Sequence, residues 1–360
     1  MPRRLKSILV QAASFALGGV LLWLALRNVD FGALGGALRE ANYWYLVPLG
    51  ALALGAHALR AWRWQMLLEA LPDAEQRTQR VPLRTAFYSV MIGYMVNYAA
   101  PRLGEVARTA NLARQTRLPF SGVLGTVVVE RLLDVLVLAV GLLVALALLA
   151  DRAAALTPIF APAADLLAEP PVAWWIIVVT GLVVVIGGAL LFRTLLARSA
   201  RAEGVAHRVV ATLHSFKDGL ASVLRAPRRL GIAATTAAIW ACYLAMAYLP
   251  LPMFGIVGLG LGDAWVLLMV GSVGMSVPSP GGVGSYHYVT IRTMEGLYGV
   301  ATAPATAYAV LSHAAQLVLY TVVGFACVLL QGASLRQLRE DAARVETSAS
   351  PGDPATEPLS

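Results

Sequence analysis

Three charged residues lie together in the otherwise apolar residues 121–150: Glu130, Arg131 and Asp134. If this stretch is a membrane helix, each charge near its centre costs roughly 2.5 to 3.5 kcal/mol. Glu130 and Asp134 are four residues apart and share a helix face, and Arg131 can pair with Asp134 three residues later. The pattern predicts a phosphate-binding or proton-relaying site. Two plainer interpretations stay open: a self-neutralising cluster that joins helices, or a helix that begins near Arg131 and leaves the charges at the interface.

A Pro–Gly break follows the apolar residues 85–100, and four polar side chains surround it: Asn97, Arg102, Glu105 and Arg108. A broken helix exposes backbone N–H groups, and these bind anions where the second half begins. The planar fork of arginine fits a phosphate better than lysine does. These residues therefore predict an anion-binding element, with an anchored interfacial loop as the alternative.

A second break contains Pro278 and Pro280, which a continuous helix does not tolerate. Ser279, Gly281 and Gly282 are its candidate site residues, because a glycine-rich turn lets a phosphate approach the backbone. Close packing of backbone against backbone would explain the glycines equally well. No lysine follows in a P-loop pattern, so nucleotide binding is not expected.

Three further polar side chains occur in apolar runs: His287, His313 and Gln316. We expect these to be hydrogen-bonded core residues more often than proton carriers. Cys242 and Cys327 also fall in apolar runs and suit helix interfaces better than a disulfide or a metal site. No metalloprotease, redox or hydrolase motif is present. We therefore expect no catalytic residues, no metal and no cofactor.

The elements that must position these residues are membrane helices. The 360 residues are 58% hydrophobic and 13% charged, whereas soluble domains are about 25% charged. Uncharged runs occupy residues 7–26, 172–192, 231–262 and 296–334, and a span needs roughly 20 apolar residues. The chain is expected to be an all-α, multi-pass membrane protein with no separate soluble domain.

The net charge of +8 is distributed as in a membrane protein, which argues against nucleic acid as a partner. Residues 193–229 carry eight Lys or Arg against two acids, and residues 151–171 one Arg against three acids. The positive-inside rule then puts the N-terminus, and also the C-terminus, on the cytoplasmic side. Residues 28–42 become a short outer loop. An interfacial belt of aromatic and cationic side chains is expected at His57, Arg60, Trp62, Arg63 and Trp64.

Both flanks of residues 85–107 lie on the inner side in this topology, and both flanks of residues 263–294 on the outer side. Each segment is therefore predicted to be a re-entrant hairpin. Two broken segments that enter from opposite faces are typical of an inverted repeat. The expected fold has about six full transmembrane helices plus these hairpins in residues 1–335, with a basic linker at 193–229. Residues 336–360 are expected to be a disordered cytoplasmic tail.

Three motifs in this order resemble the lysylphosphatidylglycerol synthase transmembrane (flippase-like) family. They are NYAAPRLGEVAR at residues 97–108, ERLLD at 130–134 and SVPSPGGVGS at 276–285, with RAWRW upstream at 60–64. The resemblance covers about residues 1–335 and implies an inner-membrane protein that moves lipids or lipid-linked groups between leaflets. Lysyl-lipid synthases carry a soluble transferase domain after this region. Few residues follow Leu330 here, so lysyl transfer is not expected.

The resemblance and the charges together favour a flippase that grips a phospholipid or polyprenyl-phosphate head group. Membrane lipids with an anionic or phosphate-bearing head group are the expected partners. Two other functions stay open. The same acids and arginines could serve an integral enzyme that acts on a lipid phosphate, or the chain could be a non-transporting partner of an envelope glycosyltransferase or another envelope-biogenesis protein.

Overall fold

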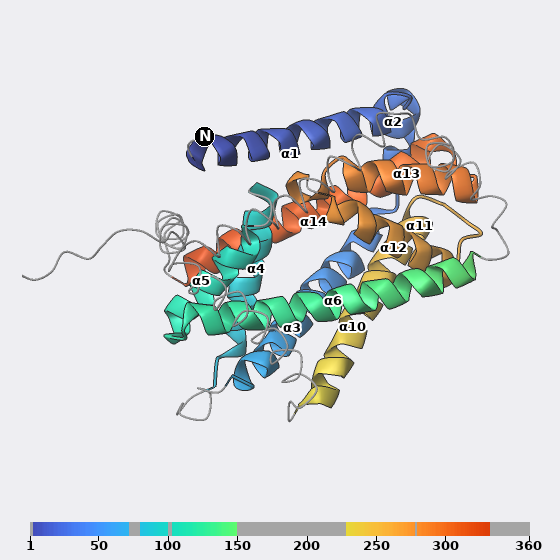
Figure 1. Ribbon diagram of the computed structural model, residues 1–360. Coiled ribbons are helices and arrows are strands. Elements are labelled where there is room, and N and C mark those ends of the chain that lie inside the picture. Colours follow the sequence, from blue (N-terminus) through green and yellow to red (C-terminus); the bar gives the residue numbers. More distant parts are fainter. Residues whose placement is uncertain (1–2, 72–79, 100–102, 150–227, 278, 332–360) are drawn as a thin grey trace, which may run out of the picture.

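The structure is a computed structural model that describes residues 3–71, 80–99, 103–149, 228–277 and 279–331 (Figure 1). All regular elements in these ranges are helices. They are α1 (Arg3–Leu26), α2 (Phe31–Glu40), η1 (Tyr43–Tyr45), α3 (Leu46–Glu69), α4 (Leu83–Ala99), α5 (Gly104–Thr116), α6 (Phe120–Leu148), α10 (Arg229–Tyr248), α11 (Pro250–Met253), α12 (Leu261–Ser276), η4 (Pro280–Gly282), α13 (Ser285–Tyr298) and α14 (Thr302–Leu330). The all-α prediction is confirmed for the described residues.

Three described spans are long and apolar enough to cross a membrane: Phe120–Leu148, Arg229–Met253 and Thr302–Leu330. The pair Ser14–Leu26 and Phe31–Glu40, bent by 86°, makes a fourth if it is counted as one span. A multi-pass membrane protein is supported in this way, while the number six stays a prediction. The predicted crossing at 172–192, the tail at 336–360 and nearly all of the basic linker lie outside the described residues.

The connection at residues 28–42, expected to be a short outer loop, contains a helix that was not predicted, α2. Asp30 caps it, because its carboxylate accepts hydrogen bonds from the N–H groups of Gly32 at 2.7 Å and Ala33 at 3.2 Å. An aspartate at this position stabilises a helix start. A short apolar sequence such as FGALGGALRE can then form a helix that packs against α14.

The first broken segment is an antiparallel pair of helices, α4 and α5. Their backbones approach so closely at Gly93 that an added Cβ would lie 2.9 Å from the carbonyl oxygen of Gly104. The Asn97 side chain accepts a hydrogen bond from the Gly104 N–H at 2.8 Å, and Asn111 bonds Ser89 further along. Asn97 thus satisfies the backbone N–H of Gly104, a free donor at the start of α5.

The second broken segment pairs α12 with α13 around the turn η4. Gly281, Gly282 and Gly284 have φ values of 56°, 77° and 88°, a region that residues with a Cβ rarely adopt. The two helices run antiparallel, since Gly274 contacts Val289 near the turn and Tyr298 contacts the Asp263 carbonyl at the far end. Both predicted breaks therefore occur in the structure as helical hairpins.

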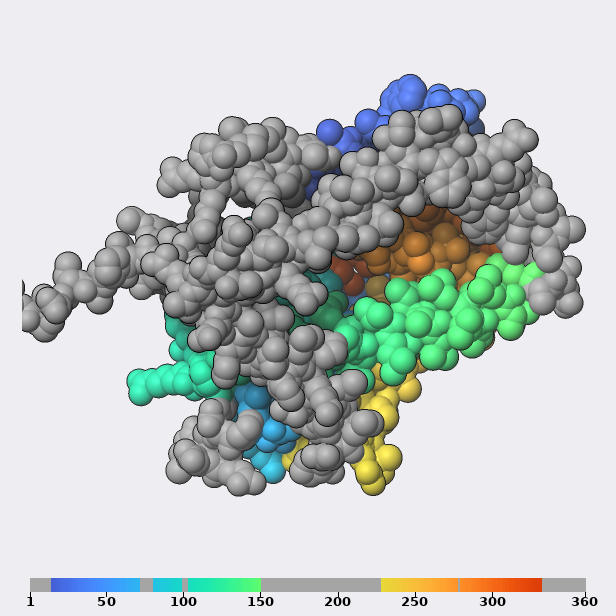
Figure 2. Space-filling model, viewed as in Figure 1, coloured from blue at the N-terminus to red at the C-terminus, as the bar shows by residue number. Residues whose placement is uncertain are grey.

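The tips of the two hairpins touch each other. A Cβ added to Gly281 would overlap the ring of Tyr98, which lies one residue before the end of α4. Around this contact, α3 lies beside α10, α14 packs against α4, and α1 lies along α13 (Figure 1). Helix α6, in green, contacts α12 and lies below the orange helices in the space-filling view (Figure 2).

Candidate functional site

The predicted interfacial belt on α3 is wrong for its charged residues, which are buried. Arg60 is 3% exposed and Arg63 is fully buried, while Trp62 alone in this group is an exposed large side chain. His57, Arg60 and Arg63 follow one another at three-residue spacing and so lie on one helix face. The opposite face carries Trp62. The α3 arginines are therefore core residues, because carboxylates on another helix meet them.

Those carboxylates are Glu130 and Asp134 of α6. Arg60 forms ion pairs with both, at 2.8 Å to Asp134 and closer to Glu130. Arg63 lies 2.8 Å from Asp134 and 3.5 Å from Glu130. It also donates a hydrogen bond to Thr236 on α10. Two carboxylates one helical turn apart thus bind two arginines one helical turn apart, which ties α3 to α6.

Arg108, from the first hairpin, completes the buried part of the cluster. Its guanidinium lies 3.2 Å from Glu130 and stacks over Trp64 at 5.0 Å from the ring centroid. Gly93 leaves space for it, because a Cβ there would be 3.0 Å from the Arg108 Cβ. Glu130 is fully buried and faces three buried arginines. The carboxylate therefore anchors the hairpin to the bundle.

Arg131 differs from the other three arginines because its side chain is 40% exposed. It lies 3.7 Å from Glu105 and from Asp134 and 3.9 Å from Glu130. These are ion-pair distances but longer than a normal hydrogen bond of 2.7 to 3.2 Å. The predicted Arg131–Asp134 pairing is present, though loosely. Arg131 consequently keeps donor capacity that a ligand could use.

The alternative in which α6 begins near Arg131 is wrong. The helix begins at Phe120, a full ten residues before the buried Glu130. Glu130 and Asp134 are therefore inside the helix and inside the bundle. The exposed face of α6 carries apolar side chains instead, among them Val135, Leu136 and Leu143.

A cavity of about 550 Å³ lies over this cluster. Most of the predicted site residues line it: Asn97, Glu105, Arg131, Asp134, Ser279, Gly281, Gly282, His313 and Gln316. The two hairpins, which are far apart in sequence, both contribute to the wall. Arg108 and Glu130 lie behind the wall and hold it in place. Arg102 lies outside the described residues.

His287 does not line the cavity. Its ring stacks on that of His313 with centroids 4.9 Å apart, and its Nδ1 accepts a hydrogen bond from the Gly284 N–H at 3.3 Å. Ser279 and Ser285 share a hydrogen bond of 2.9 Å across the same turn. These contacts fit the expectation of a hydrogen-bonded core residue for His287, whereas His313 lines the cavity.

A large part of the wall, mostly aromatic, was not among the predicted site residues. The additional residues are His57, Arg60, Tyr94, Tyr98, Tyr243, Tyr286, Tyr308 and Tyr320. Tyr94 and Tyr98 are four residues apart in an apolar helix, and this spacing was the available signal. The His57 ring lies between Tyr94 and Tyr320, with centroids at 4.2 and 4.5 Å. Neither of its ring nitrogens has a hydrogen-bond partner among the described residues.

The cluster carries a surplus of positive charge. Among the described residues, Arg60, Arg63, Arg108 and Arg131 face Glu105, Glu130 and Asp134, that is, four cations against three anions. Buried charges are stable only when they are paired, and Arg131, the least buried of the four arginines, lines the cavity where a further anion could balance the surplus. The arrangement is suited to an anion. The described residues hold no group of three or more His, Cys, Asp or Glu side chains placed for a metal ion.

Comparison with known proteins gives one match. The family model described as the lysylphosphatidylglycerol synthase TM region matches residues 11–324. No curated protein and no solved structure matches the chain. The matched range includes the three sequence motifs, at residues 97–108, 130–134 and 276–285.

Proposed function

Because this chain belongs to the lysylphosphatidylglycerol synthase TM region family, we propose that it moves the polar head group of a lipid from one leaflet of the membrane to the other. Family membership already implies a membrane domain with a lipid-related role. One observation carries the finer proposal: the cavity between the two hairpin tips combines an exposed arginine with a polar and aromatic wall. A path of this kind lowers the cost of taking a head group through hydrocarbon.

The proposed substrate group is a phosphate, either of a phospholipid or of a polyprenyl-phosphate-linked lipid. Arg131 presents guanidinium donors to the cavity, and these fit phosphate oxygens. The surplus of one cation in the cluster balances one negative charge. Asn97 and His313 add neutral polar groups to the same wall.

We propose that the hairpins are re-entrant and enter the membrane from opposite faces as an inverted repeat. In that arrangement the touching tips, Tyr98 and Gly281, mark the narrowest point of the path. Non-helical backbone survives at membrane depth only where it is buried in protein or lines a cavity, and described residues on either side of each break line this cavity. Movement of one hairpin tip against the other would open the path while the lipid tails stay in the bilayer. The location is the inner membrane, with both termini cytoplasmic.

The role of the charges is transport rather than chemistry. Glu130 is enclosed by arginines and cannot reach a substrate in the cavity, so it is a positioning residue. Arg131 and Asp134 reach the cavity. There Arg131 binds the phosphate, and Asp134 orients Arg131. An enzyme would release a covalently altered lipid, and mass analysis of the lipid after the transport assay separates the two functions.

The test is lipid exchange in proteoliposomes. Purified protein is reconstituted with fluorescent phosphatidylglycerol, and dithionite bleaching reports the lipid that reaches the outer leaflet. A charge-assisted hydrogen bond contributes about 1.5 to 3 kcal/mol, so Arg131→Gln should slow exchange about tenfold or more. Arg292→Gln is the matched control. The Arg292 side chain is 42% exposed, close to the 40% of Arg131, and it also pairs with an acid three residues later. Equal exchange by both variants would contradict the proposal.

A further inference from the structure

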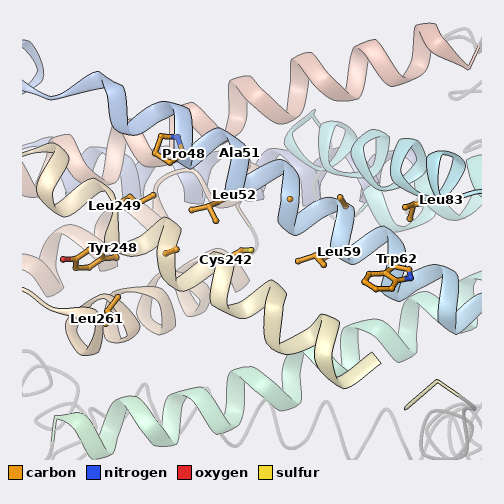
Figure 3. Close-up of a pocket in the computed structure, with 13 residues that line it drawn as sticks. Pro48, Ala51, Leu52, Leu59, Trp62, Leu83, Cys242, Tyr248, Leu249 and Leu261 are labelled. Atoms are coloured by element: carbon orange, nitrogen blue, oxygen red, sulfur yellow. The ribbon is translucent and has the colours of Figure 1, made fainter. Parts of the chain in front are cut away.

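A second cavity of about 830 Å³ lies on the outer side of α3, away from the arginines. It is a groove between α3 and α10, and no charged residue lines it. Figure 3 shows its lining side chains between these helices, with Pro48 and Leu249 at one end and Trp62 and Leu83 at the other. Helix α3 thus has two different faces: Arg60 lines the polar cavity with Arg63 buried beside it, and the opposite face lines an apolar groove.

The dimensions of the groove suit one acyl chain. Along α3 it extends from Pro48 to Trp62, which corresponds to about 21 Å at the helical rise of 1.5 Å per residue. Half of a bilayer core of about 30 Å is shorter than this, so a fatty acyl chain of one leaflet can lie along the groove. Trp62, 47% exposed, marks the end where a membrane interface is expected.

Cations gather at the Trp62 end. Arg84, in the first turn of α4, follows the groove residue Leu83, and it is exposed and makes no ion pair with another described residue. Arg80 and Arg228 both pair with Glu69, at 3.7 and 3.0 Å. Among the described residues, these three cations against one carboxylate give this end a positive charge. A zwitterionic head group would leave that charge unbalanced, whereas an anionic one would match it.

We propose that this groove is a binding site for one anionic glycerophospholipid, with an acyl chain between α3 and α10 and its phosphate near Arg84. The site is separate from the cavity over Glu130 and does not depend on the transport proposal. A second copy of the chain is a poorer occupant, because its own arginine-rich end would lie at the same depth in the membrane. The proposed lipid would brace α3 against α10 from the side opposite the ion pairs.

The test uses the groove residue Gly55. An added Cβ at this position meets no atom within 4 Å, so Gly55→Leu can extend a side chain into the groove from an open position, and leucine also favours the helix. Native mass spectrometry of the full chain, delipidated and then incubated with palmitoyl-oleoyl phosphatidylglycerol or phosphatidylcholine, measures the retained lipid. We expect the wild type to retain one more phosphatidylglycerol per chain than Gly55→Leu, with at least a tenfold loss of that additional lipid in the variant. This difference separates the groove from any lipid in the cavity over Glu130.

Two matched controls accompany it. Gly125→Leu makes the same change on α6, also with no atom within 4 Å, and should retain the lipid. Arg84→Gln should reduce the preference for phosphatidylglycerol about fivefold, since one cation near an anionic lipid contributes about 1 kcal/mol, whereas Arg39→Gln on α2 should not. Equal retention by Gly55→Leu and wild type would overturn the proposal. A wild type that retains no lipid would also overturn it, since another occupant, such as residues 172–192 or a second copy of the chain, would then fill the groove. A wild type that retains both lipids equally would overturn it as well.

Discussion

Glu130 and Arg131 are consecutive residues, yet the fold gives them opposite environments. Glu130 points into the bundle and contacts arginines from α3 and α5. Arg131, one residue further around the helix, reaches the cavity and keeps only loose ion pairs. A helix rotates about 100° per residue, and this rotation separates a structural charge from a charge that is available to a ligand. Substitutions at the two positions should therefore fail in different ways.

Glu130→Gln should destabilise the protein. It removes the carboxylate that faces Arg60, Arg63 and Arg108 and leaves buried cations without balance, a change that costs about 3 to 5 kcal/mol. Unfolding of the detergent-solubilised protein, followed by tryptophan fluorescence, measures the loss. Glu69→Gln is the control: Glu69 also has two ion pairs but lies nearer the surface, where such pairs contribute about 1 kcal/mol or less. Similar losses in the two variants would show that Glu130 is no anchor.

At this scale the sequence predicted the carboxylates but not their partners. Glu130 and Asp134 interrupt an apolar run and so attract attention at once. Arg60 and Arg63 end an apolar run instead, beside Trp62 and Trp64, and that pattern is typical of a membrane interface. Only the three-residue spacing of His57, Arg60 and Arg63 distinguishes a buried stripe from a belt. That spacing indicates a buried stripe only when the two carboxylates of α6 are known to face it.

At the scale of elements, each hairpin depends on a few positions where a side chain must be absent. Gly93 and Gly104 allow α4 and α5 to touch. Gly281 serves the second hairpin in two ways, since it has a φ of 56° and it gives space to Tyr98. These two requirements can be separated by comparison with Gly299, which has a φ of 63° and no neighbour within 4 Å of an added Cβ.

Gly281→Ala should impair exchange much more than Gly299→Ala does. Both variants place a Cβ on a left-handed backbone, which costs roughly 1 kcal/mol. Only Gly281→Ala also pushes against Tyr98 and so disturbs the contact between the tips. The dithionite assay gives exchange rates, and unfolding of each variant gives the shared backbone cost. If the two variants have the same exchange rate, the tip contact has no part in transport.

The breaks themselves were predictable, because prolines and glycines cannot continue a helix. The meeting of the tips was not, since Tyr98 and Gly281 belong to segments almost two hundred residues apart and a short apolar helix can pack in many ways. Helix α2 was missed for a different reason. Residues 28–42 carry one Arg against two acids, which is typical of an outer loop, whereas the N-cap Asp30 is the signal that predicts the helix.

At the scale of the whole molecule, both hairpins contribute to one cavity and leave their helix ends far from it. The tips meet at Tyr98 and Gly281, whereas the outer ends of the hairpins are the start of α4 with the end of α5 and the start of α12 with the end of α13. The inverted-repeat proposal requires these two pairs of ends to lie on opposite sides of the membrane. A simple bundle of full crossings does not require this.

Cysteine labelling in vesicles of known orientation tests that requirement. In a chain with Cys242→Ala and Cys327→Ala, Gln115→Cys places an exposed thiol at the outer end of the first hairpin, and Val257→Cys places one before the second. A membrane-impermeant maleimide added from outside should label Val257→Cys at once and Gln115→Cys only after permeabilisation, because positive charge holds the first hairpin's ends inside. Labelling of both thiols from one side would exclude opposed hairpins, and the cavity would then need a different path for its ligand.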